Sequence, residues 1–305
     1  MPQDISAAFP FTSRFINVKG SKIHYIDEGA GDPVLFIHGN PTSSYIWRNI
    51  MPYLQQDARV IALDLIGFGK SDKPDINYGF QDSYAYLEGF IEALGLKNIT
   101  LVVQDWGSGL GFHYANTHRD NIKGLAFMEA MYEQKDWASL SLGLKAAMVM
   151  MRARLSSYVM LGLGNMFVKS MLPQWVNRGL TAEEHAQYLA PFPTVASRKP
   201  IYVFPRDVPL RDKPEASASA VNAYNAWLQE TQIPKILFHA DPGMLIPREE
   251  VPWIAENFPN ITLVDIGKGT HFVQEDSPHQ IGAALKDWYQ GISVAPNGTD
   301  TAVGQ

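Results

Sequence analysis

The chain of 305 residues is 46% hydrophobic, carries a formal net charge of −6 and contains no cysteine. This length and apolar content allow a large core and suit one main domain with a sizeable insertion. The acidic balance offers no basic face for nucleic acid or anionic lipid, and the absence of cysteine excludes disulfides, thiol nucleophiles and thiolate metal sites. We therefore expect a globular protein that acts on a small molecule.

Neither the N-terminus nor the most apolar stretch predicts export or membrane insertion. Residues 1–10 lack the charged and apolar regions of a secretory signal, so a cytoplasmic location is expected. The apolar stretch 140–168 is interrupted by Lys145, Arg152 and Arg154 before a segment of membrane length builds up. We interpret it as amphipathic helices that bury one face, and expect no membrane partner.

Short apolar runs alternate with helical patterns along most of the chain. Helices are predicted over 82–94 and 110–116, and strands are predicted at 13–18, 22–27, 34–38, 60–63, 99–103, 122–128, 236–238 and 261–266. Strands interleaved with helices indicate a mostly parallel central sheet with helices on both faces, the α/β class.

The alternation stops between residues 132 and 210, where Met, Leu, Phe and Trp recur at helical spacing. We predict a helical cap over 132–210, inserted into a main domain formed by 1–131 and 211–293, with a fraying tail at 294–305. A cap over the carboxyl ends of the strands would enclose a cavity where α/β sheets bind ligands. The charges of the cap are expected to be solvated: Glu183, Glu184, Asp207 and Arg211.

Asp105 lies where the strand at 99–103 breaks into a small-residue turn, Gln104-Asp105-Trp106-Gly107-Ser108-Gly109. A turn between strand and helix that projects its side chain above the sheet is the nucleophile elbow of α/β-hydrolases. The serine version, G-x-S-x-G, does not occur, so a serine hydrolase is disfavoured. Taken alone, Asp105 fits a helix N-cap equally well.

His271 and Glu129 strengthen the catalytic interpretation of Asp105. His271 follows the last predicted strand, and Glu129 ends the strand at 122–128, so both should reach the same edge of the sheet. The order nucleophile, acid, histidine is the α/β-hydrolase order. Asp241, which follows the strand at 236–238, is a rival for the acid that orients His271.

An aspartate nucleophile is ionised near neutral pH and attacks carbon without a general base. His271 would then activate water to hydrolyse the resulting ester. Trp106 and Asn40 offer neutral N–H donors near the elbow, which suits a departing halide. Core packing of Trp106 and a turn role for Asn40, which precedes Pro41, are the alternatives.

Four segments resemble the haloalkane dehalogenase family, and the similarity covers the chain up to about Ile292: Phe36-Ile37-His38-Gly39-Asn40-Pro41, Asp64-Leu65-Ile66-Gly67-Phe68-Gly69-Lys70-Ser71, Val103-Gln104-Asp105-Trp106-Gly107 and Gly269-Thr270-His271-Phe272. Phe127-Met128-Glu129 is similar to the branch that places its acid after the sixth strand. The resemblance implies an α/β-hydrolase fold with Asp105 as nucleophile, His271 as base, Glu129 as acid, and Asn40 with Trp106 as the halide pair.

The same resemblance implies a substrate pocket walled by Phe167, Met171, Trp175, Pro205, Val208 and Leu245. Trp175 is bulkier than the residue such enzymes often have at their tunnel, which leaves the width of the access path open. The implied partners are a halogenated alkane, water and halide, without cofactor or metal. The oligomeric state, monomer or dimer, is open.

Three alternatives remain at this level. Epoxide hydrolases share the aspartate and histidine, but they resemble a pattern with His where this chain has Gln104; Tyr158, Tyr188 and Tyr202 in the predicted cap keep this alternative open. Coelenterazine luciferases are similar to the same family. A catalytically silent receptor on this fold is the third alternative.

Overall fold

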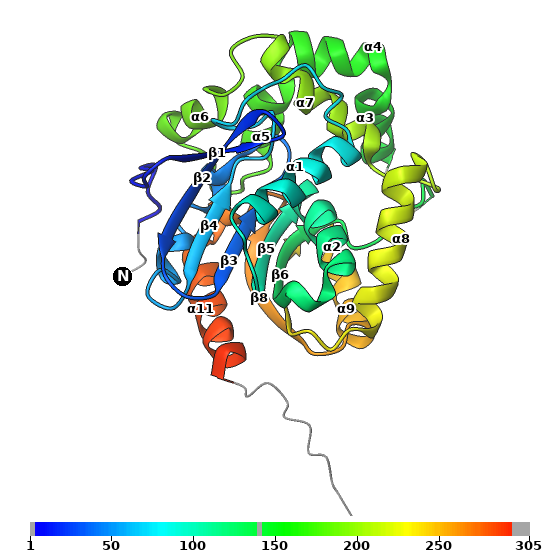
Figure 1. Cartoon of the computed structure of the whole chain (residues 1–305). Coiled ribbons are helices and arrows are strands. Elements are labelled where there is room, and N and C mark those ends of the chain that lie inside the picture. Colours follow the sequence, from blue (N-terminus) through cyan, green and yellow to red (C-terminus); the bar gives the residue numbers. More distant parts are fainter. Residues whose placement is uncertain (1–3, 139–141, 295–305) are drawn as a thin grey trace, which may run out of the picture.

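An eight-stranded sheet forms the centre of the computed structural model, which describes residues 4–138 and 142–294 (Figure 1). The strand order is β1-β2-β4-β3-β5-β6-β7-β8; the β1–β2 and β2–β4 pairs are antiparallel and the other pairs are parallel. This confirms the α/β prediction. The strands are β1 (Arg14–Val18), β2 (Ser21–Gly29), β3 (Pro33–Ile37), β4 (Arg59–Leu63), β5 (Ile99–Asp105), β6 (Ile122–Ala130), β7 (Lys235–Pro242) and β8 (Ile261–Gly269).

Helices cover both faces of this sheet. Figure 1 shows α1 (Phe80–Ala93), α2 (Trp106–Thr117) and α8 (Glu215–Glu230) on one face and α11 (Pro278–Val294) on the other. Because it is covered on both sides, β3 is an unbroken apolar run, fully buried from Val34 to Ile37. Shorter helices join these elements: η1 (Ser44–Trp47), η2 (Met51–Tyr53), η3 (Arg119–Asn121), η8 (Arg248–Glu250), α9 (Val251–Asn257) and α10 (Val273–Asp276).

A second group of helices lies between β6 and α8 in the chain and above one edge of the sheet (Figure 1). Pro173, Pro200 and Pro205 lie in the first turns of three helices of this group. Proline fits the first turn of a helix, but it has no N–H to continue a helix that precedes it. The helical segments of this group are α3 (Leu142–Arg152), α4 (Arg154–Ser157), η4 (Tyr158–Leu163), η5 (Phe167–Met171), α5 (Leu172–Gln174), α6 (Ala182–Leu189), η6 (Ala196–Arg198), α7 (Lys199–Val203) and η7 (Phe204–Asp207).

The expected tail at 294–305 and the apolar stretch at 140–168 lie partly outside the described residues. Val294 closes α11, and residues 295–305 of the expected tail lie outside the described part, as do residues 140 and 141 of the apolar stretch. Over residues 4–138 and 142–294, no helix combines the length and apolar character needed to cross a membrane.

The helix after Asp105 begins earlier than predicted. Residues 106–109 were expected to form a turn ahead of a helix at 110–116, yet α2 begins at Trp106. The glycines of this run serve close packing: a Cβ on Gly107 would lie 2.2 Å from the carbonyl oxygen of Ile37, and one on Gly111 would lie 2.8 Å from Val103. In the sequence, glycines that a helix needs for close contact with a strand cannot be told from glycines of a turn, which is why the helix was predicted to start too late.

The expectation that all four cap charges are solvated is wrong for Glu184. Glu183 and Arg211 are exposed and Asp207 is partly buried, but Glu184 is only 1% exposed. It faces inward because Arg48 and Arg178 donate hydrogen bonds to its carboxylate. A buried charge requires such partners, and the sequence does not reveal them.

Candidate active site

Asp105 stands on a strained turn between β5 and α2. Its backbone has φ 50° and ψ −130°, a conformation that residues other than glycine rarely adopt. The Ser108 hydroxyl donates to the Asp105 carbonyl oxygen at 2.5 Å and accepts from the backbone N–H of Met131 at 2.8 Å, which ties the turn to the end of β6. The Asp105 side chain makes no capping hydrogen bond to α2, so the N-cap alternative does not describe it.

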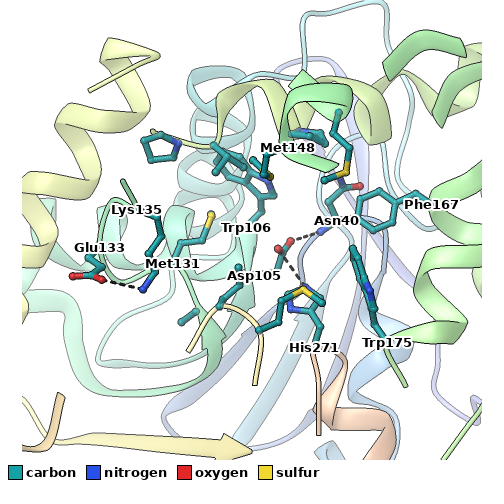
Figure 2. Close-up of a pocket in the computed structure, with 17 residues that line it drawn as sticks. Asn40, Asp105, Trp106, Met131, Glu133, Lys135, Met148, Phe167, Trp175 and His271 are labelled. Atoms are coloured by element: carbon teal, nitrogen blue, oxygen red, sulfur yellow. Dashed lines mark hydrogen bonds and ion pairs between the residues drawn. The ribbon is translucent and has the colours of Figure 1, made fainter. Parts of the chain in front are cut away.

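The carboxylate of Asp105 is instead held from the loop after β3. The backbone N–H of Asn40 donates to Asp105 Oδ1 at 2.8 Å. This approach requires glycine at position 39, because a Cβ there would lie 2.2 Å from Asp105 Oδ1. One carboxylate oxygen is thus fixed by the main chain, while Oδ2 faces His271 (Figure 2).

His271 lies between two carboxylates. Its Nε2 is 3.5 Å from Asp105 Oδ2, and its Nδ1 is 3.1 Å from Glu129 Oε2. Glu129 in turn accepts backbone hydrogen bonds from Met244 and Leu245, at 3.0 and 2.8 Å. His271 and Glu129 are each only 3% exposed, so their mutual interaction is poorly screened by water.

Burial and the two carboxylates act in opposite directions on the pKa of His271. Burial alone lowers the pKa, but hydrogen bonding and charge attraction from Asp105 and Glu129 outweigh it and raise the pKa from 6.5 to about 9. Loss of the charge on Asp105 would therefore lower the pKa of His271.

Asp241, the rival for the acid, does not approach His271. Its side chain is 52% exposed and forms an ion pair with Arg248 at 2.9 Å. Glu129 occupies the position beside His271 because β6 continues to Ala130 and Glu129 takes a positive φ of 41° near its end. The structure therefore brings Asp105, Glu129 and His271 together and leaves Asp241 at the surface.

Asn40 and Trp106 line the same cavity as Asp105 (Figure 2). The Asn40 amide donates one hydrogen bond to the carbonyl of Ile201 at 3.2 Å, while its Oδ1 is buried without a partner among the described residues. Trp106 is 3% exposed and packs edge to face on Phe204, with ring centroids 4.8 Å apart. Both the core-packing role and the donor role of Trp106 are compatible with this position.

The cavity above Asp105 has a volume of about 130 Å³ and a mainly apolar wall. Among the predicted wall residues, Phe167, Trp175, Pro205, Val208 and Leu245 line it. Met171 does not line it. The rings of Phe167 and Trp175 pack edge to face at 5.5 Å and form that side of the wall, whereas Met171 packs half-buried against the hydrophobic core.

Several residues at the site were not predicted from the sequence. The additional lining residues are four methionines, two other apolar residues and one ion pair: Met131, Met148, Met151, Met244, Ala130, Pro209, Glu133 and Lys135. Gln104 lies behind the histidine, with its Nε2 3.2 Å from His271 Nε2 and donating to the His271 carbonyl at 3.3 Å. Ser108, which joins the Asp105 carbonyl to the Met131 N–H, was also not predicted. The only signal in the sequence was its place three residues after Asp105, in the first turn of the helix.

The described residues include no group of three His, Asp or Glu side chains placed to share a metal ion. None of the described residues that line the cavity is a tyrosine. Tyr188 is buried against Glu275, and Tyr158 packs edge to face against Tyr202 with ring centroids 5.6 Å apart. The three cap tyrosines of the epoxide hydrolase alternative therefore lie away from Asp105.

Comparison with known proteins agrees with this geometry. Residues 32–172 match the α/β-hydrolase fold family. A haloalkane dehalogenase of Sphingobium indicum is 41% identical and covers 94% of this chain and 99% of its own length; one of Mesorhizobium japonicum is 39% identical and covers 98% and 97%. The crystal structure of haloalkane dehalogenase DbeA from Bradyrhizobium elkani superposes with a TM-score of 0.90 at 38% identity over 93% of this chain and 99% of that one. With an aspartate on its elbow and relatives of this similarity over nearly its whole length, the chain belongs to the haloalkane dehalogenase family of the α/β-hydrolase superfamily.

Proposed function

We propose that the protein hydrolyses the carbon–halogen bonds of haloalkanes to an alcohol, a halide ion and a proton, with Asp105, His271 and Glu129 as the catalytic residues. The observation that carries this proposal is the carboxylate of Asp105 at the floor of an apolar cavity, 3.5 Å from His271. A mainly apolar cavity favours an uncharged, apolar substrate and offers the nucleophile few polar partners.

In the first step, Asp105 Oδ2 attacks the carbon that bears the halogen. A bond forms between Oδ2 and carbon, and the carbon–halogen bond breaks with its electron pair leaving on the halide. Oδ1 stays bound to the Asn40 backbone N–H, which fixes the direction of attack. The products are an alkyl ester of Asp105 and a halide ion.

Asn40 and Trp106 are proposed to bind the departing halide. One amide hydrogen of Asn40 is engaged by Ile201, so the other remains for the halide, and the indole N–H of Trp106 supplies a second donor from the same cavity. Neutral donors suit this task because they stabilise charge that develops in the transition state without binding the uncharged substrate tightly.

In the second step, His271 takes a proton from water, which attacks the ester carbonyl carbon of Asp105. The negative charge develops on Oδ1, where the Asn40 backbone N–H stabilises it. Alkylation has removed the charge of Asp105, and hence one cause of the raised pKa of His271, so the imidazole is better able to act as a base at this step. The tetrahedral intermediate collapses by breaking the bond between carbon and the alkoxy oxygen, which takes the proton back from His271 and leaves as the alcohol. The carboxylic acid then loses its proton to solvent, which restores the Asp105 carboxylate and neutral His271.

Glu129 is proposed to orient His271 and to stabilise its protonated form. Its carboxylate is fixed by the N–H groups of Met244 and Leu245 and accepts from His271 Nδ1, which leaves Nε2 directed at Asp105. Asp241 lacks this contact and is not part of the proposal.

The helices over the cavity supply its apolar wall, and we infer the same division as from the sequence: a cap at 132–210 and a main domain at 1–131 and 211–293. The lining residues proposed to contact the alkyl chain are Phe167, Trp175, Pro205, Val208 and Leu245. A cytoplasmic location is also proposed, since a chain without cysteine needs no oxidising compartment.

Bromide release from 1-bromobutane and 1,2-dibromoethane tests the proposed function directly. We expect bromide and the matching alcohol in equal amounts. Failure to release bromide from several such substrates, together with turnover of styrene oxide, would favour the epoxide hydrolase alternative. Light emission with coelenterazine would favour the luciferase alternative, and binding without turnover of any of these compounds would favour a receptor.

A further inference from the structure

A mostly buried cluster of charges lies near the His271 loop and is not used by the reaction. It consists of Arg48, Arg178, Glu184, Glu275 and the hydroxyl of Tyr188. Arg48 donates to both oxygens of Glu275, at 2.6 and 2.9 Å, and to Glu184 at 2.9 Å. Arg178 donates to Glu184 at 2.7 Å and to Glu275 at 2.6 Å, and Tyr188 donates to Glu275.

The two arginines and two glutamates balance one another in charge. Glu184 and Glu275 are at most 1% exposed and Arg48 is 3% exposed. Burying three of these four charges, with Arg178 reaching in from the surface, is a costly way to join two surfaces, because their desolvation offsets much of their attraction. Such a cluster supplies directional hydrogen bonds, which apolar packing does not. The segments that it joins indicate which part of the active site these bonds position.

Glu275 joins three segments, and each carries a residue of the site. It lies four residues after His271, in α10. Arg48 follows η1, in the loop region that begins with Asn40. Arg178 and Tyr188 belong to the segment that follows Trp175, which forms the cavity wall opposite Met131 (Figure 2). One carboxylate therefore receives hydrogen bonds from the segment that follows Asn40 and from the segment that follows the wall residue Trp175.

Residues 175–178 are also bound along the main chain of the His271 loop. The backbone N–H groups of His271 and Phe272 point to the carbonyl oxygen of Trp175 at 3.4 and 3.3 Å. Arg178 continues this contact: its Nε donates to the Glu275 carbonyl at 2.5 Å, and its backbone N–H donates to Asp276 Oδ1 at 2.9 Å. Trp175 and Arg178 thus bind the His271 loop at both ends of the stretch from residue 271 to residue 276.

Glu184 provides an internal comparison. It binds the same two arginines and is buried to the same extent, yet in the described part of the chain it has no hydrogen bond to residues 270–276. Glu184 belongs to α6 and also completes a capping box with Thr181, a role that glutamine fills equally well.

We propose that Glu275, gripped by Arg48 and Arg178, is a positioning residue for His271: it fixes the loop that sets the imidazole against Asp105 and against the wall residue Trp175. This inference rests on the proposed two-step mechanism and adds a residue to it. Alkylation of Asp105 does not need His271, whereas hydrolysis of the ester does. A shift of the His271 loop therefore slows the second step and spares the first.

The test compares Glu275→Gln with Glu184→Gln in the full-length protein. After rapid mixing with 1,2-dibromoethane, early bromide release reports alkylation, and the decay of alkylated protein, followed by quenching and mass spectrometry, reports hydrolysis. We expect Glu275→Gln to slow hydrolysis by about 10- to 100-fold and to leave alkylation within about twofold, so that alkylated protein accumulates. Glu184→Gln should leave the ratio of the two rates as in the unaltered protein.

Arg178→Lys is a milder second variant, because it keeps the charge balance but cannot hold Glu275 with a guanidinium fork. It should shift the ratio in the same direction and by less, even where Glu275→Gln folds poorly. Equal slowing of both steps, an unchanged ratio in both variants, or an equal selective effect in Glu184→Gln would overturn the positioning role. Absence of bromide release by the unaltered protein would instead contradict the proposed function and is seen in the same experiment.

Discussion

The sheet edge and the helices above it are built by different means. At the edge, the reactive side chains are held by main-chain groups: the Asn40 N–H fixes Asp105, and the N–H groups of Met244 and Leu245 fix Glu129. The wall above presents apolar side chains of short helices to the cavity, including Met148, Met151 and Phe167. Directional contacts define one geometry, whereas apolar packing tolerates substitution at similar volume. Under the proposed function, this difference predicts that the edge sets the reaction and the wall sets the choice of substrate.

His271→Phe should have the largest effect, because it removes the proposed base and leaves the proposed nucleophile, Asp105. We expect steady-state turnover of 1-bromobutane to fall by about 10⁴-fold or more, with one alkyl group retained on Asp105. Intact-protein and peptide mass spectrometry would detect the added butyl group. Asp105→Ala is the matched control and should gain no mass; a variant at His271 that turns over normally would contradict the assignment of the base.

Glu129→Gln should have the next largest effect. It keeps the size of the side chain but removes the charge that accompanies a protonated His271, so we expect the turnover number to fall by about 10²- to 10⁴-fold. Asp241→Asn, at an exposed ion pair, should change it by less than about twofold. Halide release at saturating substrate measures both, and a reversed order would transfer the role of the acid to Asp241.

The carboxylates of the edge should also make stability depend on pH. The pKa of His271 is raised from 6.5 to about 9 in the folded protein, so its protonation favours the folded state. This contribution is fully present below pH 6.5 and is lost as the pH rises through about 9. Relative to His271→Phe, the unaltered protein should lose on the order of 2 kcal/mol of unfolding free energy between pH 6.5 and 9. Urea unfolding at both pH values measures this difference, and parallel curves for the two proteins would refute the charge argument.

A change in the wall should have the smallest effect on the reaction and alter selectivity instead. Trp175→Ala removes the indole but keeps the carbonyl that binds the His271 loop. We expect kcat/KM for 1-bromohexane to rise by about 3- to 10-fold relative to that for 1-bromobutane. Trp253→Ala, at a partly exposed tryptophan of α9, is the control and should leave this ratio unchanged. A large loss for both substrates would mean that the wall takes part in the reaction itself.

Much of the fold and of the reactive centre could be predicted from the sequence, since the patterns involved are local. Strands of buried apolar residues, such as β3 and β5, are recognisable because a strand covered on both faces has no polar alternation. Asp105 could be identified because it ends a strand of this kind, and His271 because it lies just beyond the last predicted strand. The helical character of the segment between β6 and α8 could be predicted because its apolar residues recur at helical spacing, which is also a local pattern.

The remaining features depend on contacts between distant residues, and only the tertiary structure decided them. Glu129 was implied as the acid only by the resemblance, since position after a strand left Asp241 as a rival; which of the two lies beside His271 depends on how the end of β6 and the loop after β8 meet. The absence of Met171 from the cavity wall and the presence of Met131 and Met148 in it also depend on contacts of this kind. Glu184 and Glu275 look like surface charges in the sequence, because what buries a charge is an arginine more than 90 residues away in the chain, as Arg178 is for Glu275 and Arg48 for both. Composition and periodicity determine where strands and helices form; the pairing of buried polar groups is a property of the folded chain.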